Sequence, residues 1–282
     1  MGKTLFISDL DGTLLNKNAQ ITHATAKIIN GLIDGGLIFT YATARGFNTA
    51  KKVTGEINFK YPAVYHNGAF TQNPQTGDYF DKCCFDKNQI GKIIGDLEKS
   101  SLFPLVYAII DGRERVSWIC GKESDGIKFY LETHEGDKRL RPVIDYSEFH
   151  DGDIHEVTFI ADSPKELDEI LRNLNLSDHF TYHIFEDAYE DTYGKVKYWL
   201  EIKRFDAKKD AGVIKVKEIT GADRIICFGD NTNDIPMFNV SDEKYAVENA
   251  VDEVKNIATS IINSNENDGV AKWLEKHAED YF

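Results

Sequence analysis

Two aspartates, Asp9 and Asp11, follow the first apolar run of the chain and are separated by one leucine. The run from Leu5 to Ile7 predicts a buried strand, and ligands of open parallel sheets bind beyond the carboxyl ends of the strands. Both carboxylates would therefore project into the crevice where such a protein does its chemistry. Asp and Gly are also common turn residues, so a turn or a helix cap explains this segment equally well when it is taken alone.

Two kinds of metal site can be compared with this pair of carboxylates. An EF-hand calcium loop that starts at Asp9 needs Gly at its sixth position and Glu at its twelfth, whereas the chain has Leu14 and Gln20 there. The sequence therefore excludes an EF-hand. The D-x-D metal site of sugar-nucleotide transferases fits the spacing, but this pattern is short and occurs often by chance.

A second acidic cluster favours a magnesium site. The segment from Gly229 to Asp234, GDNTND, follows the apolar run from Arg224 to Phe228, which predicts another buried strand. Ile235 stands where an EF-hand that starts at Asp230 would need Gly. Oxygen ligands from two such clusters suit a hard divalent cation such as Mg²⁺, with water and a substrate phosphate in the remaining positions.

The residues around these clusters have the pattern of parallel strands joined by helices. Strand-like runs at residues 37–39 and 63–65 follow the first strand, and the same alternation returns after residue 210. The first helix is predicted from apolar residues at helical spacing, with Gly35 and Gly36 at its end: Ile21, Thr25, Ile28 and Leu32.

The middle of the chain has a different pattern, in which strand pairs dominate. Asp111 and Gly112 lie between two apolar runs and predict a hairpin. The sequence therefore predicts an α/β fold with a doubly wound, Rossmann-like parallel-sheet core and an inserted α+β domain. We expect residues 1–80 and 195–282 to form the core and residues 81–194 to form the insert.

Composition limits the partners of the protein. The chain has 282 residues, and 33 Lys and Arg against 47 Asp and Glu give a net charge of −14, which argues against a nucleic-acid backbone or an anionic membrane as partner. A small anionic substrate remains compatible with this net charge, because its binding depends on the charges of the local site. No apolar run approaches the ~18 residues that span a bilayer, and Asp9 comes too early for a signal peptide.

Cysteine usage points to a reducing compartment. The four cysteines include no C-x-x-C pair, so neither a disulfide framework nor a zinc site is indicated. The histidines of the insert, among them His134, His155 and His183, lack metal-ligand spacing and are interpreted as structural or surface residues. We expect a cytoplasmic protein that is a monomer or a weak homo-oligomer.

The motifs, in this order, resemble those of the haloacid dehalogenase superfamily of phosphotransferases, in its Cof-type branch, the sugar-phosphate-phosphatase-like group. They are DLDGTL at Asp9 to Leu14, TAR at Thr43 to Arg45, NGA at Asn67 to Ala69, a lysine near position 209, and GDNTND at Gly229 to Asp234. The resemblance extends from end to end of the chain. It implies that the insert is an α/β cap that closes over the substrate and determines specificity.

The resemblance also implies roles for the acidic residues. Asp9 would attack phosphorus to give an aspartyl-phosphate, and Asp11 would be the general acid and then the general base. Mg²⁺ would be bound by the Asp9 carboxylate, the Asp11 backbone carbonyl and Asp230. Asp234 would orient these ligands or bind the metal through water, and Asn233 would give polar support near the phosphate.

Phosphate-binding residues are carried over in the same way. Thr43 would offer a hydroxyl and a backbone N–H near the start of a helix, where phosphate is favoured. The family usually has Gly where this chain has Ala44, and Arg45 would contact the substrate or support its loop. The other residues that the resemblance places at the phosphate are Leu10, Asn67 and Gly68.

Two adjacent lysines, Lys208 and Lys209, could each compensate the phosphate charge. Helical spacing favours Lys209, because Val213, Val216 and Ile219 follow it on one predicted inward face. Lys208 would then point toward solvent.

The leading hypothesis is a Mg²⁺-dependent phosphatase that hydrolyses a small phosphate monoester, with a sugar phosphate as the favoured substrate. A phosphomutase would use the same aspartyl chemistry but return the phosphate to a sugar. A regulator that binds sugar phosphates without turnover is the third hypothesis, although such a protein has no need of an acid beside a nucleophile.

Overall fold

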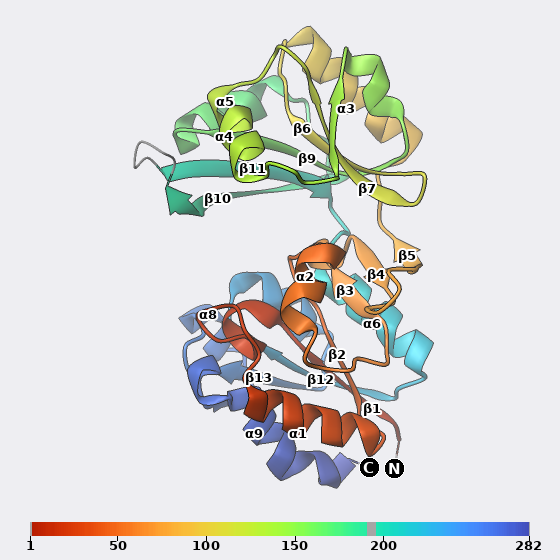
Figure 1. Cartoon of the computed structure of the whole chain (residues 1–282), viewed down its shortest axis with the longest axis vertical. Coiled ribbons are helices and arrows are strands. Elements are labelled where there is room, and N and C mark those ends of the chain that lie inside the picture. Colours follow the sequence, from red (N-terminus) through yellow and green to blue (C-terminus); the bar gives the residue numbers. More distant parts are fainter. Residues whose placement is uncertain (1, 191–195, 282) are drawn as a thin grey trace. The chain divides into compact units, whose positions relative to one another are not determined.

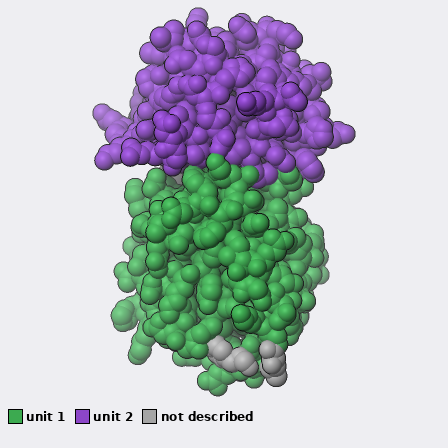
Figure 2. All heavy atoms as spheres, turned by 90° about the vertical axis from the view of Figure 1, so that its right-hand side faces the viewer, with its two compact units in different colours: residues 1–82, 206–282 green, residues 83–205 purple. Residues whose placement is uncertain are grey.

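The computed structural model describes residues 2–190 and 196–281 and divides the chain into two compact units (Figures 1 and 2). The first unit contains residues 1–82 and 206–282, and the second contains residues 83–205. The boundary expected at residues 194 and 195 lies outside the described residues. The strand that follows it, β11 (Val196–Arg204), pairs with β10 (Phe180–Glu190) and belongs to the second unit, which therefore extends to residue 205.

The first unit contains elements from both ends of the chain. Before the insert they are β1 (Thr4–Ser8), η1 (Leu10–Leu14), α1 (His23–Asp34), β2 (Ile38–Tyr41), α2 (Phe47–Thr54), β3 (Ala63–Tyr65), η2 (His66–Gly68), β4 (Phe70–Gln72) and β5 (Tyr79–Lys82). After the insert they are α6 (Lys209–Thr220), β12 (Arg224–Gly229), η4 (Thr232–Asp234), α7 (Ile235–Asn239), β13 (Glu243–Val247), α8 (Asp252–Lys255), β14 (Ser260–Ile262), η5 (Asn265–Asn267), α9 (Gly269–His277) and η6 (Ala278–Tyr281).

The main sheet of this unit is parallel, with strand order β14-β13-β12-β1-β2 (Figure 1). From β1 the chain proceeds through α1 to β2 on one side, whereas from β12 it proceeds to β13 and β14 on the other. The strand order therefore reverses between β1 and β12, where Ser8 pairs with Phe228. Ligands of doubly wound sheets bind at such a reversal, beyond the carboxyl ends of the strands. The predicted α/β core is confirmed.

A small antiparallel sheet, with strand order β3-β4-β5, continues the main sheet. Its link to the main sheet is a parallel bridge between Ala42 and Val64, supported by a hydrogen bond from the Thr43 N–H to the Val64 carbonyl. This bridge brings the loop after β2 beside the loop after β3.

The helices of the core follow the predicted pattern, with two differences in which side chains are buried. In α1 the buried face is formed by Ala26, Ile29 and Ile33 together with Thr25, so it is rotated from the expected stripe through Ile28 and Leu32. In α6 Val213 and Val216 are buried as expected, whereas Ile219 is 40% exposed because it lies in the last turn, next to the end of the helix at Thr220.

The second unit is a six-stranded sheet with helices on both faces. Its elements are α3 (Lys87–Lys99), β6 (Leu105–Ile110), β7 (Arg113–Ile119), α4 (Asp125–Thr133), β8 (Leu140–Val143), η3 (Tyr146–His150), β9 (Asp153–Ala161), α5 (Pro164–Asn173), β10 and β11. The strand order is β10-β11-β9-β6-β7-β8, and all neighbours are antiparallel except β7 and β8. The predicted hairpin joins β6 to β7, and Asp111 and Gly112 both have positive φ there.

The two faces of this sheet carry different side chains. Residues of α3 and α5 pack on one face in a continuous apolar core that includes Ile93, Leu97 and Leu167. On the other face a smaller apolar cluster contains Tyr130 of α4 and Trp118 of β7. The apolar content of both faces explains why this unit has a core of its own.

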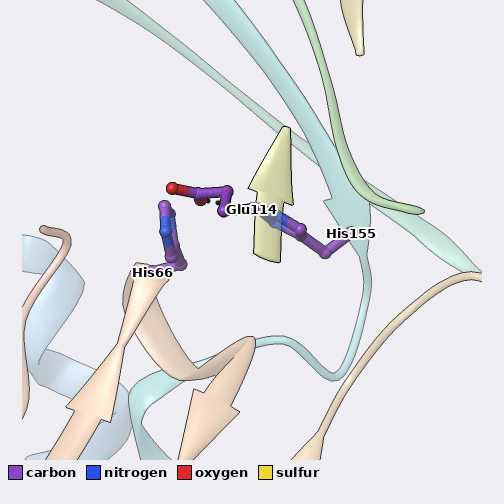
Figure 3. Close-up of side chains that lie close together, drawn as sticks. All are labelled: His66, Glu114 and His155. Carbon is purple, nitrogen blue, oxygen red and sulfur yellow. Dashed lines mark ion pairs between the residues drawn. The ribbon is translucent and has the colours of Figure 1, made fainter. Parts of the chain in front are cut away.

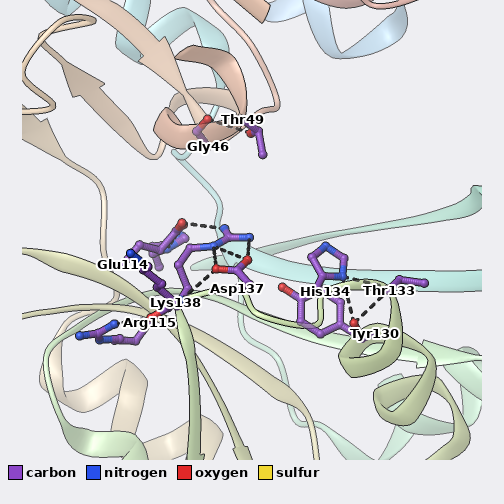
Figure 4. Close-up of polar contacts among 11 residues, drawn as sticks. Gly46, Thr49, Glu114, Arg115, Tyr130, Thr133, His134, Asp137 and Lys138 are labelled. Atoms are coloured by element: carbon purple, nitrogen blue, oxygen red, sulfur yellow. Dashed lines mark hydrogen bonds and ion pairs between the residues drawn. The ribbon is translucent and has the colours of Figure 1, made fainter. Parts of the chain in front are cut away.

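Next to the smaller cluster the second unit has a group of charged side chains. Arg139 donates to both carboxylate oxygens of Asp137 and, at 2.8 Å, to Glu114. Asp137 and Glu114 are labelled in Figure 4. The imidazole Nε2 of His155 lies 3.6 Å from the other oxygen of Glu114 (Figure 3). In the described part of the chain, no helix is both long and apolar enough to cross a membrane.

Candidate active site

The two acidic loops meet because their strands are neighbours in the sheet. The Asp9 N–H donates to the Phe228 carbonyl at 2.9 Å, so the chain after β1 begins its turn directly beside the end of β12. Carboxylate oxygens of Asp9, Asp230 and Asp234 all lie within 4.8 Å of one another. Residues separated by more than 200 positions thus form one acidic cluster, at the place where the strand order reverses.

Lys209 lies inside this cluster. Its Nζ donates to Asp9 Oδ1 and to Asp234 Oδ1, each at 2.6 Å, and the side chains of Lys209 and Asp234 are fully buried. Lys209 is the first residue of α6, whereas Lys208 is the residue before the helix and is exposed. Of the two adjacent lysines, the structure therefore places Lys209 against Asp9.

Asp234 organises the second acidic loop. Its Oδ2 accepts the backbone N–H groups of Asp230 at 2.9 Å and Asn231 at 3.1 Å, while its Oδ1 accepts Lys209. A carboxylate that is buried and accepts this many donors holds the backbone around it in one conformation. Asp234 therefore fixes the loop that presents Asp230.

Two residues of the first motif, Gly12 and Thr13, join the acidic loops, and sequence analysis assigned neither of them a role. The Thr13 hydroxyl donates to Asp230 Oδ1 at 2.8 Å. Gly12 has φ of +77°, and a Cβ at this position would overlap the Asp230 carboxylate. Their positions within DLDGTL, directly after the aspartates, were the available signal.

The charge balance of the cluster favours a bound cation. Burial raises the pKa of Asp9 well above its ordinary value; Lys209 opposes this shift and Asp234 adds to it. Burial, with Asp234 adding to the effect, raises the pKa of Asp230 to about 6, although the Thr13 hydrogen bond acts the other way. Burial alone would lower the pKa of Lys209, but Asp234 and Asp9 raise it above its usual range.

Three carboxylates surround one ammonium, so the cluster needs additional positive charge, and its free ligand atoms are all oxygens. A hard divalent cation such as Mg²⁺ would meet both requirements. Asp9 and Asp230 carry the oxygens that fit this ion best, because Asp234 already accepts three donors.

Asp11 is not part of this cluster and pairs with Arg45. The guanidinium donates through Nε to Asp11 Oδ2 at 2.7 Å and through Nη2 to Oδ1 at 2.6 Å. The Asp11 side chain is 50% exposed. Arg45, expected to contact the substrate or support its loop, thus contacts the residue expected to be the general acid.

Thr43 is fully buried at the end of β2. Its hydroxyl accepts the Arg45 N–H at 3.1 Å, and its carbonyl accepts the Asn67 N–H at 2.9 Å. α2 begins only at Phe47, with Gly46 as the residue before it, so Thr43 is not at a helix N-terminus, contrary to expectation. The bridge to β3 extends this loop before the helix can begin. Ala44 beside it is exposed.

The loop after β3 completes the site. Asn67 Oδ1 accepts the Asn233 amide at 3.1 Å, which connects this loop to the second acidic loop. Gly68 has φ of +108°, and a Cβ there would overlap the backbone of Lys208. Leu10, which the resemblance places at the phosphate, is fully buried, and neither its side chain nor its backbone is exposed.

Known proteins resemble this chain in both sequence and fold. The model of the family described as haloacid dehalogenase-like hydrolase matches residues 6–274. The 5-amino-6-(5-phospho-D-ribitylamino)uracil phosphatase YitU of Bacillus subtilis is 27% identical over 97% of each chain. YwtE of the same organism, which has the same phosphatase name, is 24% identical over 95% of this chain and 96% of its own.

Solved structures show the same fold over nearly the whole chain. TM0651 from Thermotoga maritima superposes with a TM-score of 0.74 at 24% identity and covers 98% of this chain and 97% of its own. BT1666 from Bacteroides thetaiotaomicron, described among phosphatases of the haloalkanoate enzyme superfamily, gives 0.72 at 17% identity, with 99% and 96% covered.

Proposed function

The chain belongs to the family of haloacid dehalogenase-like hydrolases and is a phosphatase, and we propose that it hydrolyses a small phosphate monoester through Mg²⁺ and a covalent phosphate on Asp9. A sugar phosphate or a similar polyol phosphate is the proposed substrate class. The names of YitU and YwtE support this class, because they specify a substrate with a phosphorylated ribityl chain.

One observation carries the proposal: Lys209 lies between Asp9 and Asp234 at 2.6 Å from each, beside Asp230. Burial by itself favours protonated Asp9, which cannot attack phosphorus. Lys209 favours the ionised form. This arrangement suits a carboxylate nucleophile that must stay charged inside the protein.

In the proposed first step, an Asp9 carboxylate oxygen attacks phosphorus in line with the ester oxygen. The new bond joins Asp9 to phosphorus, and the bond from phosphorus to the ester oxygen breaks. Asp11, after it exchanges one of its two Arg45 hydrogen bonds for a proton, gives this proton to the ester oxygen, so the leaving group departs as an alcohol. Lys209 stabilises negative charge on the transferring phosphoryl group.

The second step returns the enzyme to its starting state. Asp11 takes a proton from a water molecule, whose oxygen attacks phosphorus and breaks the bond to Asp9. Inorganic phosphate leaves, Asp9 is again a carboxylate, and Asp11 again carries a proton. The half-exposed position of Asp11 gives it access to water for this role.

The carboxylates of Asp9 and Asp230, with the backbone carbonyl of Asp11, are the proposed holders of Mg²⁺. When bound, the ion would supply positive charge beside the phosphoryl oxygens.

The test is phosphate release from a panel of sugar phosphates, 5-amino-6-(5-phospho-D-ribitylamino)uracil and an aryl phosphate, with Mg²⁺ or with excess EDTA. We expect release that requires Mg²⁺ and disappears in Asp9→Asn. Equal phosphate release by the Asp9→Asn protein would contradict the proposal. Failure of the wild type to release phosphate from any compound of the panel would also contradict it.

The covalent step has its own readout. The wild type is mixed with substrate, quenched within milliseconds and reduced with borohydride, which converts an acyl phosphate on aspartate to homoserine. Peptide mass spectrometry should place homoserine at position 9 only. An unmodified Asp9 under conditions of rapid turnover would exclude the aspartyl-phosphate.

A further inference from the structure

The segment between β13 and α8 contacts both acidic loops at once. Asn249 Nδ2 donates to the Gly12 carbonyl at 2.7 Å. Two residues later, the Val251 N–H donates to the Asp230 carbonyl at 2.9 Å. Gly12 follows Asp11 directly, so one short segment connects the backbone of the first acidic loop to the backbone of the second.

Asn265 supports Asn249 from the loop after β14. Its backbone N–H donates to Asn249 Oδ1 at 3.0 Å, and its own Nδ2 donates to the Leu15 carbonyl at 2.9 Å. Because a backbone N–H can only donate, the Asn249 oxygen must face Asn265 and its nitrogen must face Gly12. Asn265 is 9% exposed, so its contacts are largely protected from water.

These two asparagines therefore hold the turn η1 at its middle residue, Gly12, and at Leu15, the residue directly after it, and they are hydrogen-bonded to each other. Both contacts are made to backbone carbonyls. The acidic cluster of Asp9, Asp230 and Asp234 receives no hydrogen bond from either amide.

We propose that Asn249 and Asn265 are positioning residues that set the distance between the Asp9 loop and the Asp230 loop and thereby the affinity of the site for Mg²⁺. The inference rests on the proposed function, since it concerns the metal site of that reaction. Neither residue contacts the reacting atoms, and their effect is on the backbone of the loops.

The physical reason is the strict geometry of magnesium. Mg²⁺ requires a near-octahedral arrangement of oxygens, so ligands from two separate loops bind it well only when the loops are held in register. Gly12 has no side chain to stiffen the first loop, whose shape therefore depends on contacts such as the one from Asn249. Groups that hold metal ligands in place typically change metal affinity by about 10- to 100-fold.

The experiment compares Asn249→Ala, Asn265→Ala and the double variant with the wild type. Asn239→Ala, a change at an exposed asparagine at the end of α7, is the matched control. Mg²⁺ binding is measured by titration calorimetry without substrate, thermal unfolding without metal, and phosphate release as a function of Mg²⁺ concentration.

We expect Asn249→Ala to bind Mg²⁺ at least about 10-fold more weakly, with the Mg²⁺ concentration for half-maximal activity raised by the same factor. At saturating Mg²⁺ its kcat should return to within about threefold of the wild type, while the control is unchanged. The double variant should lose less affinity than the product of the single losses, because Asn265 acts partly through Asn249.

A folded Asn249→Ala protein with Mg²⁺ affinity within twofold of the wild type would overturn the inference, and so would a lowered unfolding temperature without a change in affinity. Asn249 is exposed, so this variant tests the idea even if Asn265→Ala fails to fold. A wild type that binds Mg²⁺ but releases no phosphate would contradict the proposed function alone, whereas one that binds no Mg²⁺ overturns both.

Discussion

Replacement of Lys209 by methionine removes the ammonium from between two buried carboxylates and keeps an unbranched side chain of similar length. Asp9 and Asp234 each lose a partner at 2.6 Å, and neither can turn to solvent because both are buried. Removal of one partner from a buried ion pair costs about 3–5 kcal/mol of unfolding free energy. We expect a loss at the lower end of this range, about 3 kcal/mol, because the carboxylates can take up a proton.

That proton predicts a pH dependence of the loss. Burial already raises the pKa of Asp9 while Lys209 opposes the shift, so without Lys209 the pKa rises further. Lys209→Met should therefore destabilise the metal-free protein more at pH 8 than at pH 5.5, where the carboxylates are more easily neutralised. A protonated Asp9 is also no nucleophile, and kcat/KM should fall by about 10²- to 10³-fold or more.

The assay separates stability from catalysis. Urea unfolding without metal gives the free energy of unfolding, and phosphate release with Mg²⁺ gives kcat/KM. Adding Asp234→Asn to Lys209→Met removes one unpaired carboxylate and should recover part of the stability but none of the activity. Lys208→Met, at the exposed neighbour, is the control and should change stability by no more than about 0.5 kcal/mol.

Two results would refute this reasoning. A Lys209→Met protein within about 1 kcal/mol of the wild type at pH 8 would show that the ion pairs contribute little after desolvation is counted. Recovery of activity together with stability in the Asp234→Asn background would show that Lys209 serves the fold and not the reaction.

Three further predictions concern the same site. Gly68→Ala should lower kcat/KM at least about 10-fold, because the added Cβ overlaps the backbone of Lys208 and displaces Lys209. The control is Gly36→Ala, which has a similar φ and no atom within 4 Å of the added Cβ, and which should cost only backbone strain of about 1 kcal/mol. Similar activity losses in the two variants would contradict this prediction. Arg45→Ala should lower the kcat/KM of the wild type about 10-fold, because Arg45 holds Asp11. The same change should leave the kcat/KM of the Asp11→Asn variant unaltered. An equal loss in both backgrounds would mean that Arg45 contacts the substrate directly. The pKa of Asp230, about 6, lies above its unfolded value of about 3.9, so this group stabilises the fold below pH 4 and loses that contribution as pH rises through 6. In urea unfolding without metal, Asp230→Asn should reduce this pH-dependent loss of stability by about 3 kcal/mol. An unchanged dependence of the unfolding free energy on pH would exclude the shift.

Local features of the chain were sufficient to predict the core and its acidic residues. Apolar runs of strand length followed at once by Asp9 and by Asp230 predict loops at strand ends, and helical spacing after Lys209 chooses between two adjacent lysines. These predictions succeed because strand pattern, helix face and motif spacing each depend on residues within a few turns of one another. The prediction that Ile219 faces inward was wrong, because helical spacing does not show how far along α6 the neighbouring elements pack against it.

Contacts between distant loops could be seen only in the folded chain. Asparagines are common in loops, and nothing in the spacing of Asn249 or Asn265 shows that they hold the turn η1. The same holds for the pairing of Arg45 with Asp11, which contact each other only because β2 lies next to β1.

The chain by itself determined the chemical groups of the site, because a carboxylate or an ammonium is a property of one residue. The tertiary structure decided the pKa values of these groups and their positions relative to one another. Lys209 contacts Asp9 although 200 positions separate them, and Asn249 contacts Gly12 although 237 positions separate them. Both contacts form because β1 and β12 are neighbours in the sheet, where the strand order reverses. Burial at that reversal shifts the pKa values of Asp9 and Asp230, and burial depends on every element that packs around the site and not on any one segment.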